Sequence, residues 1–317
     1  MVFGSEGYLG SAIIDFFLKK NYQVYGFDKH IYRQKKLESK KNYFYINCDI
    51  RNPNKILKII KEKSIKNVLL LGGLVGDPIV KKYPKLANEV NLVSIKKFVK
   101  NLNTFFSGRL IYISTCSNYG VSKSNSLLTE KSRLNPVSIY AKQKVAIELF
   151  LKKNNFNFTY TIMRFATAFG LSKRMRFDLT VNEFCKESYI SNMIEVYEPH
   201  RFRPYCHVKD FSRAIFKVFN SKKYLIDQEI FNCGNNKNNY TKSKICQILK
   251  KFNKKLIIKY NHNIVDKRNY KVSFSKINKK LSFKCLYSVE YGIREIIEYL
   301  KKNKKIDYDK LGNYIIN

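Results

Sequence analysis

The sequence lacks the features of several common protein classes. Its longest apolar stretch, residues 68–75, contains glycines and is far shorter than the roughly eighteen apolar residues of a membrane-spanning helix. The chain does not begin with a basic region followed by an apolar core, so no secretory signal is visible. The seven cysteines are odd in number and form no CxxC motif, which favours reduced thiols in a cytoplasm over disulfides or a metal site.

Acidic side chains are also scarce. The 24 Asp and Glu residues face 61 Lys and Arg, which gives a formal net charge of +37. A chain this basic can bind nucleic acid or an anionic surface. The lysines, however, are spread along the whole length instead of gathering in one arm or helix, so we favour a solvated basic surface over dedicated nucleic-acid binding. Such a surface would still attract a nucleotide diphosphate.

The first half of the chain alternates between two apolar periodicities. The length of 317 residues and the hydrophobic content of 44% suit one large domain or two closely joined ones. Strands are expected at residues 1–3, 22–27, 42–47, 67–71, 109–114 and 158–163, and helices at 8–20, 54–63, 85–102 and 136–153. This rhythm predicts an α/β fold with a doubly wound parallel sheet of the Rossmann type.

A glycine-rich turn follows the first expected strand. Its sequence is Gly4-Ser5-Glu6-Gly7-Tyr8-Leu9-Gly10, a GxxGxxG pattern that leads into a helix. The glycines permit close approach of the backbone to a pyrophosphate, and the helix offers free N–H groups and a favourable dipole. Asp28 ends the second strand about twenty residues later, where a carboxylate can bind both hydroxyls of an adenosine ribose. The pattern favours NAD as the cofactor, although Lys29 beside Asp28 leaves NADP open.

Two further strand ends supply candidate cofactor contacts. Asp49 and Ile50 follow the third strand, where an acid can accept a hydrogen bond from the adenine amino group; Asp49 could equally cap the next helix. Leu71, Gly72 and Gly73 end the fourth strand, at the edge where ligands lie in such sheets. Small residues there would admit a cofactor, and a simple turn is the alternative.

Tyr140 and Lys144 form a YxxxK pattern in the helix expected at residues 136–153. Residues four apart share one helix face. A lysine there, together with a positive nicotinamide ring, stabilises tyrosinate and lowers the phenol pKa from about 10 toward neutral. The tyrosine then becomes a general base for a substrate hydroxyl while hydride leaves for the cofactor. Because tyrosine and lysine are abundant in this chain, a YxxxK pattern can also arise by chance, and its sequence context decides its meaning.

Several motifs nevertheless occur together and in order. They are the GxxGxxG turn, Asp28, residues 74–78 (LVGDP), Asn91, residues 114–120 (STCSNYG), the YxxxK pair, and residues 164–170, 172–178 and 203–210. Through them the chain resembles, nearly end to end, the extended short-chain dehydrogenase/reductases, which include nucleotide-sugar epimerases and dehydratases. The resemblance implies an NAD-dependent enzyme whose substrate is a nucleotide-diphosphate sugar, and a homodimer formed through the helix that carries Tyr140.

The resemblance also implies roles for individual residues. Thr115 would orient the sugar O4, Tyr140 would be the acid/base, and Lys144 would bind the nicotinamide ribose and lower the tyrosine pKa. The alternative for Thr115 is a strand threonine that satisfies its own backbone. Asn91 joins the expected cofactor contacts. Arg203 would bind the nucleotide diphosphate through its guanidinium fork.

Other residues of the second half keep two interpretations. Asn182 matches a substrate-contacting position, or it is a polar helix residue. Arg176 forms an internal salt bridge or meets a phosphate. His207 is expected to be a packed histidine, and Asp210 to cap the helix that follows it.

Cys116 and Ser117 stand where sugar 4,6-dehydratases usually carry Asp-Glu, and we count both among the expected substrate contacts. A thiol with a pKa of about 8.5 is a poor substitute for a carboxylate, so dehydration is disfavoured. The residues that oxidation at C4 requires in this family, Thr115, Tyr140 and Lys144, are all present. We therefore expect a nucleotide-sugar epimerase, with a C4-dehydrogenase or ketoreductase, a 4,6-dehydratase, or a non-enzymatic RNA- or partner-binding protein of the same fold as alternatives.

The domain organisation follows from where the rhythm changes. After residue 165 the segments become irregular, with helices expected near residues 177–188, 210–220, 241–252 and 289–302. We expect an NAD-binding domain over residues 1–165, to which segments around 205–235 return. Residues 166–204 and 236–317 would form a smaller α/β substrate-binding lobe. The first strand is short by several residues, as expected if the start of the chain is truncated.

Overall fold

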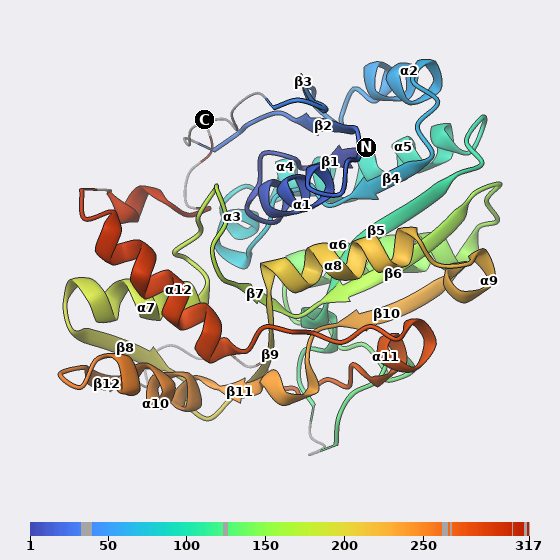
Figure 1. The fold of residues 1–317 in the computed structure, drawn as a ribbon. Coiled ribbons are helices and arrows are strands. Elements are labelled where there is room, and N and C mark those ends of the chain that lie inside the picture. The colour runs from blue at the N-terminus through green and yellow to red at the C-terminus, as the bar shows by residue number, and fades with distance from the viewer. Residues whose placement is uncertain are drawn as a thin grey trace.

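A computed structural model describes residues 1–32, 40–122, 126–261, 266, 268–305, 307–313 and 316 (Figure 1). In these residues a seven-stranded parallel sheet has the order β10-β6-β5-β4-β1-β2-β3. Its strands are β1 (Val2–Phe3), β2 (Val24–Asp28), β3 (Tyr43–Asn47), β4 (Asn67–Leu70), β5 (Arg109–Thr115), β6 (Thr159–Phe165) and β10 (Glu229–Cys233). The strand order reverses between β1 and β4, which leaves a crevice at their carboxyl ends. The predicted doubly wound Rossmann-type sheet is confirmed.

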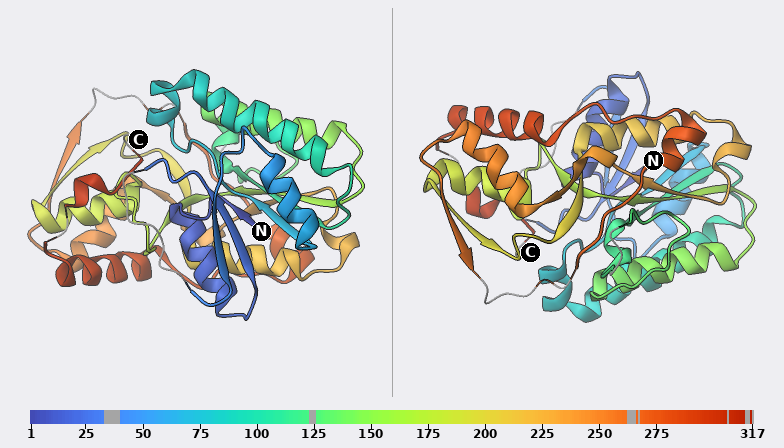
Figure 2. Two further views of the ribbon diagram at one scale, coloured as in Figure 1. Left: turned by 90° about the horizontal axis from the view of Figure 1, so that it is seen from above. Right: turned by 90° about the horizontal axis from the view of Figure 1, so that it is seen from below.

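Helices cover both faces of this sheet (Figures 1 and 2). One face packs against α1 (Tyr8–Leu18), α8 (Val208–Phe219) and α11 (Ser275–Leu281), and the other against α2 (Asn54–Glu62), α5 (Ser94–Leu102) and α6 (Ile139–Lys153). Because both faces are covered, β6 is buried along its whole length. No helix in the described ranges is both long and apolar enough to cross a membrane.

The smaller lobe has an apolar core of its own, which lies beside the carboxyl ends of the sheet strands (Figure 2). Its helices are α7 (Thr180–Ile190), α10 (Lys242–Phe252) and α12 (Val289–Lys302). Its strands are β7 (Thr167–Phe169), β9 (Phe202–His207) and β11 (Asn239–Thr241) in one small sheet, and β8 (Met193–Tyr197) and β12 (Ile257–Asn261) in another. Between them in sequence, β10 lies in the main sheet beside β6. The domain boundaries given above stay a prediction.

Two expected helix features differ in the structure. The helix expected at residues 85–102 is divided into α4 (Pro84–Asn88), a π-helical turn η1 (Glu89–Val93) and α5, and it is preceded by the short α3 (Asp77–Lys82). Asp210 does not cap α8: the His207 side chain accepts from the Lys209 N–H, while the Asp210 carboxylate accepts from the backbone of the segment that enters α12. The remaining short elements are η2 (Cys116–Tyr119), α9 (Lys223–Ile226), η3 (Asn236–Asn238) and η4 (Tyr308–Lys310).

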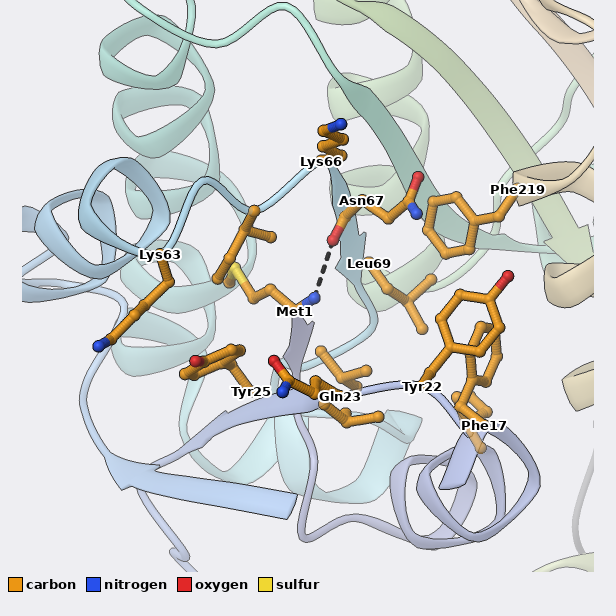
Figure 3. A pocket seen from close by; sticks show the side chains of 14 residues that line it. Met1, Phe17, Tyr22, Gln23, Tyr25, Lys63, Lys66, Asn67, Leu69 and Phe219 are labelled. Carbon is orange, nitrogen blue, oxygen red and sulfur yellow. Dashed lines mark hydrogen bonds between the residues drawn. The ribbon is translucent and has the colours of Figure 1, made fainter. Parts of the chain in front are cut away.

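The amino end of β1 borders a small cavity of about 170 Å³ (Figure 3). Val2 pairs with Gly26 and Leu69, so both neighbouring strands extend beyond β1 at this end. The Met1 ammonium donates to the Asn67 carbonyl at 2.8 Å, and burial lowers the pKa of this ammonium to about 5. The cavity lies at the amino ends of the strands, and the crevice at their carboxyl ends is separate from it.

Candidate active site

A larger cavity, of about 710 Å³, lies between the carboxyl ends of the sheet strands and the smaller lobe. Its walls include the turn after β1, the ends of β2, β4 and β5, and the start of α6. Sixteen of the predicted site residues line it: Gly4, Gly7, Tyr8, Leu9, Gly10, Asp28, Asp49, Ile50, Leu71, Gly72, Gly73, Thr115, Ser117, Tyr140, Lys144 and Arg203. The fold therefore brings the glycine-rich turn, the YxxxK pair and the candidate diphosphate arginine to one space.

The glycine-rich turn has the shape that a pyrophosphate needs. Gly4 has φ +88°, and a Cβ there would lie 2.5 Å from the Gly72 Cα. A Cβ on Gly10 would lie 2.1 Å from the Gly4 carbonyl oxygen. No described side chain caps the start of α1 at Gly7, so its first N–H groups can face an anion. The turn thus fits a dinucleotide.

Asp28 is held at the end of β2 by two backbone donors. The Glu6 N–H donates to Oδ2 at 3.0 Å and the His30 N–H donates to Oδ1 at 2.8 Å. Burial raises the pKa of the Asp28 carboxyl, and these hydrogen bonds oppose the rise. The carboxylate lies one strand away from the glycine-rich turn and lines the cavity, as binding of ribose hydroxyls requires.

Asp49 has different surroundings. Its carboxylate pairs with Arg51 at 2.7 Å and with Lys29 at 2.8 Å. Burial alone would raise the pKa of Asp49, but the hydrogen bonds from Arg51 and Lys29 lower it overall. The Lys29 ammonium is thus directed to Asp49, and Asp28 keeps its oxygens for other donors.

Tyr140 and Lys144 lie in the first two turns of α6, beside the end of β5. The helix begins after Ser138, whose hydroxyl accepts from the Ala141 N–H at 3.2 Å. Lys144 is 5% exposed; its Nζ donates to the Ile113 carbonyl at 2.8 Å and lies 5.7 Å from the centroid of the Tyr140 ring. Thr115 ends β5, and its Oγ1 accepts from the Ser117 N–H at 3.1 Å, which leaves its hydroxyl proton for another acceptor.

The described protein groups do not by themselves acidify the phenol. Burial raises the pKa of Tyr140, and the charge of Arg176 opposes this rise. Burial also lowers the pKa of the Lys144 ammonium to about 8, against the charge of Glu148. The expected fall in the Tyr140 pKa therefore stays a prediction for the enzyme with its cofactor bound.

One predicted substrate contact is wrong in its direction. Cys116 is 1% exposed, and its thiol donates to the Arg164 carbonyl at 3.3 Å within the core. Thr115 is the last residue of β5, and Cys116 begins the 3-10 turn η2, where the chain leaves the extended conformation. Thr115 and Ser117 line the cavity, whereas the Cys116 thiol lies in the core, where burial raises its pKa.

Two predicted contact asparagines support the walls of the cavity and do not line it. Asn91 accepts from the Leu74 N–H at 2.9 Å and donates to the Leu74 carbonyl at 3.0 Å, which fixes the loop after β4. Asn182 accepts from the Gly170 N–H at 3.0 Å and donates to the Tyr8 hydroxyl at 3.0 Å. Both amides are buried and occupied by protein partners, so we correct their role from ligand contact to positioning of loops.

The lobe side of the cavity is rich in charge. Arg203 pairs with Asp266 at 2.8 Å, and Arg268 pairs with both Asp266 at 2.9 Å and Asp77 at 2.8 Å. Arg176 pairs with Asp178 at 2.6 Å, so the internal salt bridge is present. The cavity-lining residues that the sequence analysis did not single out include Arg174, Lys242, Arg268 and Tyr270. They lie in irregular segments or at an element end, where no periodicity marks them.

Comparisons with known proteins identify the family and the fold of the chain. Residues 1–234 match the model of the NAD dependent epimerase/dehydratase family. An uncharacterized protein of Methanocaldococcus jannaschii is 26% identical, with 96% of each chain covered. The UDP-glucose 4-epimerase of Thermotoga maritima with UDP-glucose superposes with a TM-score of 0.84 at 20% identity, covering 96% of this chain and 99% of that one. The dTDP-glucose 4,6-dehydratase of Streptomyces venezuelae with NAD bound superposes with a TM-score of 0.83 at 17% identity, covering 96% of this chain and 97% of that one.

Proposed function

We propose, from the premise that this chain belongs to the NAD dependent epimerase/dehydratase family, that it is an epimerase of a nucleotide-diphosphate sugar acting through transient oxidation at C4. The cofactor of this family is NAD, as the glycine-rich turn and Asp28 predicted. The identity of the sugar reaction is our inference from the site.

The observation that carries the proposal is that Thr115, Tyr140 and Lys144 line the same cavity as the glycine-rich turn and Arg203. A sugar held by its diphosphate at Arg203 would place a hydroxyl near the hydroxyls of Thr115 and Tyr140. Tyr140 would take the proton of that hydroxyl, and Thr115 would orient it. Bound NAD supplies the hydride acceptor. Lys144, on the same helix face as Tyr140, would hold a positive charge near the phenolate.

The diphosphate end of the cavity supports a nucleotide-linked substrate. Arg203 and Arg268 each present a guanidinium group, the side chain best suited to bidentate contact with phosphate oxygens. The Thermotoga maritima relative was solved with UDP-glucose. We infer a substrate of this class, with the base and sugar to be identified by experiment.

The carboxylates of the cavity favour return of the hydride over elimination of water. Positions 116 and 117 carry no carboxylate, and the Cys116 thiol faces the core. Asp77 and Asp178 do line the cavity, but each is ion-paired with an arginine. Burial alone would raise the pKa of the Asp178 carboxyl, but the charge and hydrogen bond of Arg176 lower it overall, so Asp178 is a poor base for the proton at C5. This supports epimerisation.

The test is incubation of the purified chain with NAD and UDP-, GDP- and dTDP-linked sugars. The C4 epimer is followed by NMR, and NADH by its absorbance. An epimer without net NADH supports the proposal, whereas stoichiometric NADH with a keto sugar, or loss of water, would replace it with a dehydrogenase or a dehydratase. Tyr140→Phe should abolish turnover while NAD still binds. Tyr224→Phe, at a tyrosine that is 72% exposed, is the matched control.

Two further predictions accompany this proposal. A homodimer through α6 is supported by apolar side chains on that surface: Ile139 is 46% exposed and Leu149 is 48% exposed, and Val93 in η1 is 52% exposed. A cytoplasmic location is supported by the seven free cysteines. Sedimentation of the wild type and of Leu149→Glu tests the dimer.

A further inference from the structure

Two arginines of the segment 172–178 lie two residues apart and have different surroundings. Arg176 has a carboxylate partner, Asp178. Arg174 is 6% exposed and lines the cavity, and no carboxylate of the described residues lies within ion-pairing distance of it. Its Nη2 donates to the Asn313 Oδ1 at 2.8 Å, and its guanidinium carbon lies 4.4 Å from the centroid of the Tyr32 ring. Arg174 is thus a buried cation whose hydrogen-bond and ring partners, Asn313 and Tyr32, are neutral.

The surroundings of Arg174 disfavour its charge. Burial, and then the positive charge of Arg176, lower the pKa of the Arg174 guanidinium to about 10. A buried charge without a counter-ion is costly, and a second cation nearby adds to the cost. An anion that entered the cavity at this point would remove both penalties.

The place of Arg174 identifies the anion. The Ser172 hydroxyl donates to the Tyr8 carbonyl at 2.6 Å and lies 2.5 Å from the Ser11 hydroxyl. The backbone N–H of Arg174 donates to the same Ser11 hydroxyl at 3.5 Å. Tyr8 and Ser11 form the first turn of α1, whose N–H groups follow the glycine-rich turn. Arg174 therefore lies beside the start of the helix that receives a pyrophosphate.

The glycine-rich turn itself contains no cation. Residues 4–10 include no lysine or arginine, and Glu6 is their single charged residue. The turn therefore offers backbone N–H groups and the helix dipole to the two negative charges of a pyrophosphate, and no formal positive charge. A guanidinium group supplied by the smaller lobe would complete the site.

We propose that Arg174 binds the pyrophosphate of NAD from the side of the smaller lobe, with Asn313 and Tyr32 as positioning residues. This inference rests on NAD as the cofactor and is independent of the sugar chemistry proposed above. Asn313 also donates to the Val75 carbonyl at 3.0 Å, so the same side chain joins Arg174 to the loop after β4. Bound NAD would then link the main sheet and the smaller lobe.

The test compares ligands that differ in their phosphates. Dissociation constants of NAD, ADP and adenosine are measured by isothermal titration calorimetry, since the chain has no tryptophan to report binding. Arg174→Gln should weaken NAD and ADP by about 10- to 100-fold, the range of a charge-assisted hydrogen bond, and should leave adenosine unchanged. Arg174→Lys should lose less affinity for NAD and ADP than Arg174→Gln, because lysine keeps the positive charge. Lys173→Gln, the matched control, removes one charge from the neighbouring, 39% exposed side chain and should change NAD binding by less than about twofold.

Asn313→Asp separates anion binding from a structural role. An aspartate at this position would give Arg174 an internal carboxylate partner in place of the amide. The melting temperature should then rise or stay constant while the affinity for NAD falls, because the new carboxylate competes with the pyrophosphate. If Arg174 has only a structural role, the NAD affinity of Asn313→Asp should change in the same direction as its melting temperature.

Three outcomes would overturn the inference. The first is a folded Arg174→Gln that binds NAD with unchanged affinity. The second is an Arg174→Gln that loses as much affinity for adenosine as for NAD. The third is an Arg174→Gln that loses more affinity for NADP than for NAD. The last result would assign Arg174 to a 2′-phosphate. If Arg174→Gln does not fold, Arg174→Lys and Asn313→Asp give the same comparison. Absence of sugar turnover would count against the proposed epimerase and would leave these binding data unaffected.

Discussion

The two walls of the cavity are built in different ways. The sheet wall contains a group of glycines, among them Gly4, Gly10 and Gly72, whose close approach leaves no room for side chains. The lobe wall consists largely of charged side chains, and Arg203, Arg268 and Arg176 are already paired with carboxylates. The glycine turn of the sheet wall is therefore fixed by backbone packing, whereas the proposed nucleotide-sugar substrate would have to compete with carboxylates for the paired arginines of the lobe wall.

The largest effect is expected from Gly10→Ala, which disturbs the sheet wall and leaves the lobe wall unchanged. In Gly10→Ala the new Cβ would lie 2.1 Å from the Gly4 carbonyl oxygen, so the turn must move. We expect NAD binding to fall by more than about 100-fold and the free energy of unfolding to fall by about 1–3 kcal/mol, as for other overpacked sites. Calorimetric titration with NAD and urea unfolding measure the two quantities.

Gly7→Ala provides the graded comparison, because its Cβ would lie at 3.3 Å from the same oxygen. It should lose much less affinity. Normal NAD binding by Gly10→Ala would show that the turn does not cradle the cofactor.

A smaller effect is expected when the lobe wall is broken. Arg203→Gln removes a 9% exposed guanidinium that is paired with Asp266, and it should raise the KM for the nucleotide sugar by about 10- to 100-fold. The dissociation constant of NAD should stay the same, because Arg203 is proposed to bind the diphosphate of the sugar nucleotide and not the cofactor. Initial rates against substrate concentration, with NAD titrations beside them, measure both.

Arg201→Gln is the control for this change. Arg201 lies two residues earlier, is 36% exposed in its side chain and pairs with Glu198 at 2.9 Å. The KM of Arg201→Gln for the nucleotide sugar should remain within about twofold of the wild-type value, because exposed ion pairs contribute little. A change in NAD affinity on Arg203→Gln would contradict the assignment of Arg203 to the diphosphate of the substrate.

The smallest expected effect concerns the pH dependence of turnover. Burial lowers the pKa of Lys144 to about 8, so this ammonium is charged at pH 7 and mostly neutral at pH 9. Turnover that needs its charge should fall by about tenfold as pH rises from 7 to 9. Steady-state rates across this range measure the fall.

Lys144→Arg sharpens the same comparison, because a guanidinium keeps its charge at pH 9. Its pH profile should be flat over this range even if its rate is lower. An equal fall in Lys144→Arg would assign the pH dependence to another group. NAD affinity of Gly10→Ala should show no such pH dependence, since the glycine-rich turn carries no lysine.

The sheet wall could be predicted largely from the sequence. The GxxGxxG pattern lies between one strand and the next helix, and Asp28 ends the adjacent strand, so short-range order and the rule for parallel strand ends locate these residues. The same rule failed for Cys116. A motif match placed it among the substrate contacts, whereas the chain leaves the strand at Cys116 and enters the turn η2, in which the thiol donates to the Arg164 carbonyl in the core.

The lobe wall could not be predicted in this way. Arg174 and Arg176 have the same chemistry and lie two residues apart, yet within the described part of the chain only Arg176 has a carboxylate partner. The partner that orients Arg174 is Asn313, 139 residues later. Arg268 lies in an irregular segment and pairs with Asp77, 191 residues earlier. No local periodicity encodes such contacts.

By itself, the sequence determined the parallel sheet, the cofactor turn and the Tyr140–Lys144 pair, because strand and helix periodicities and short spacings are local properties of the chain. Only the tertiary structure decided which arginines are already neutralised, which face the cavity, and that Asn91 and Asn182 support its walls. Charge pairing depends on distances between residues far apart in sequence, and burial determines how much each such contact contributes.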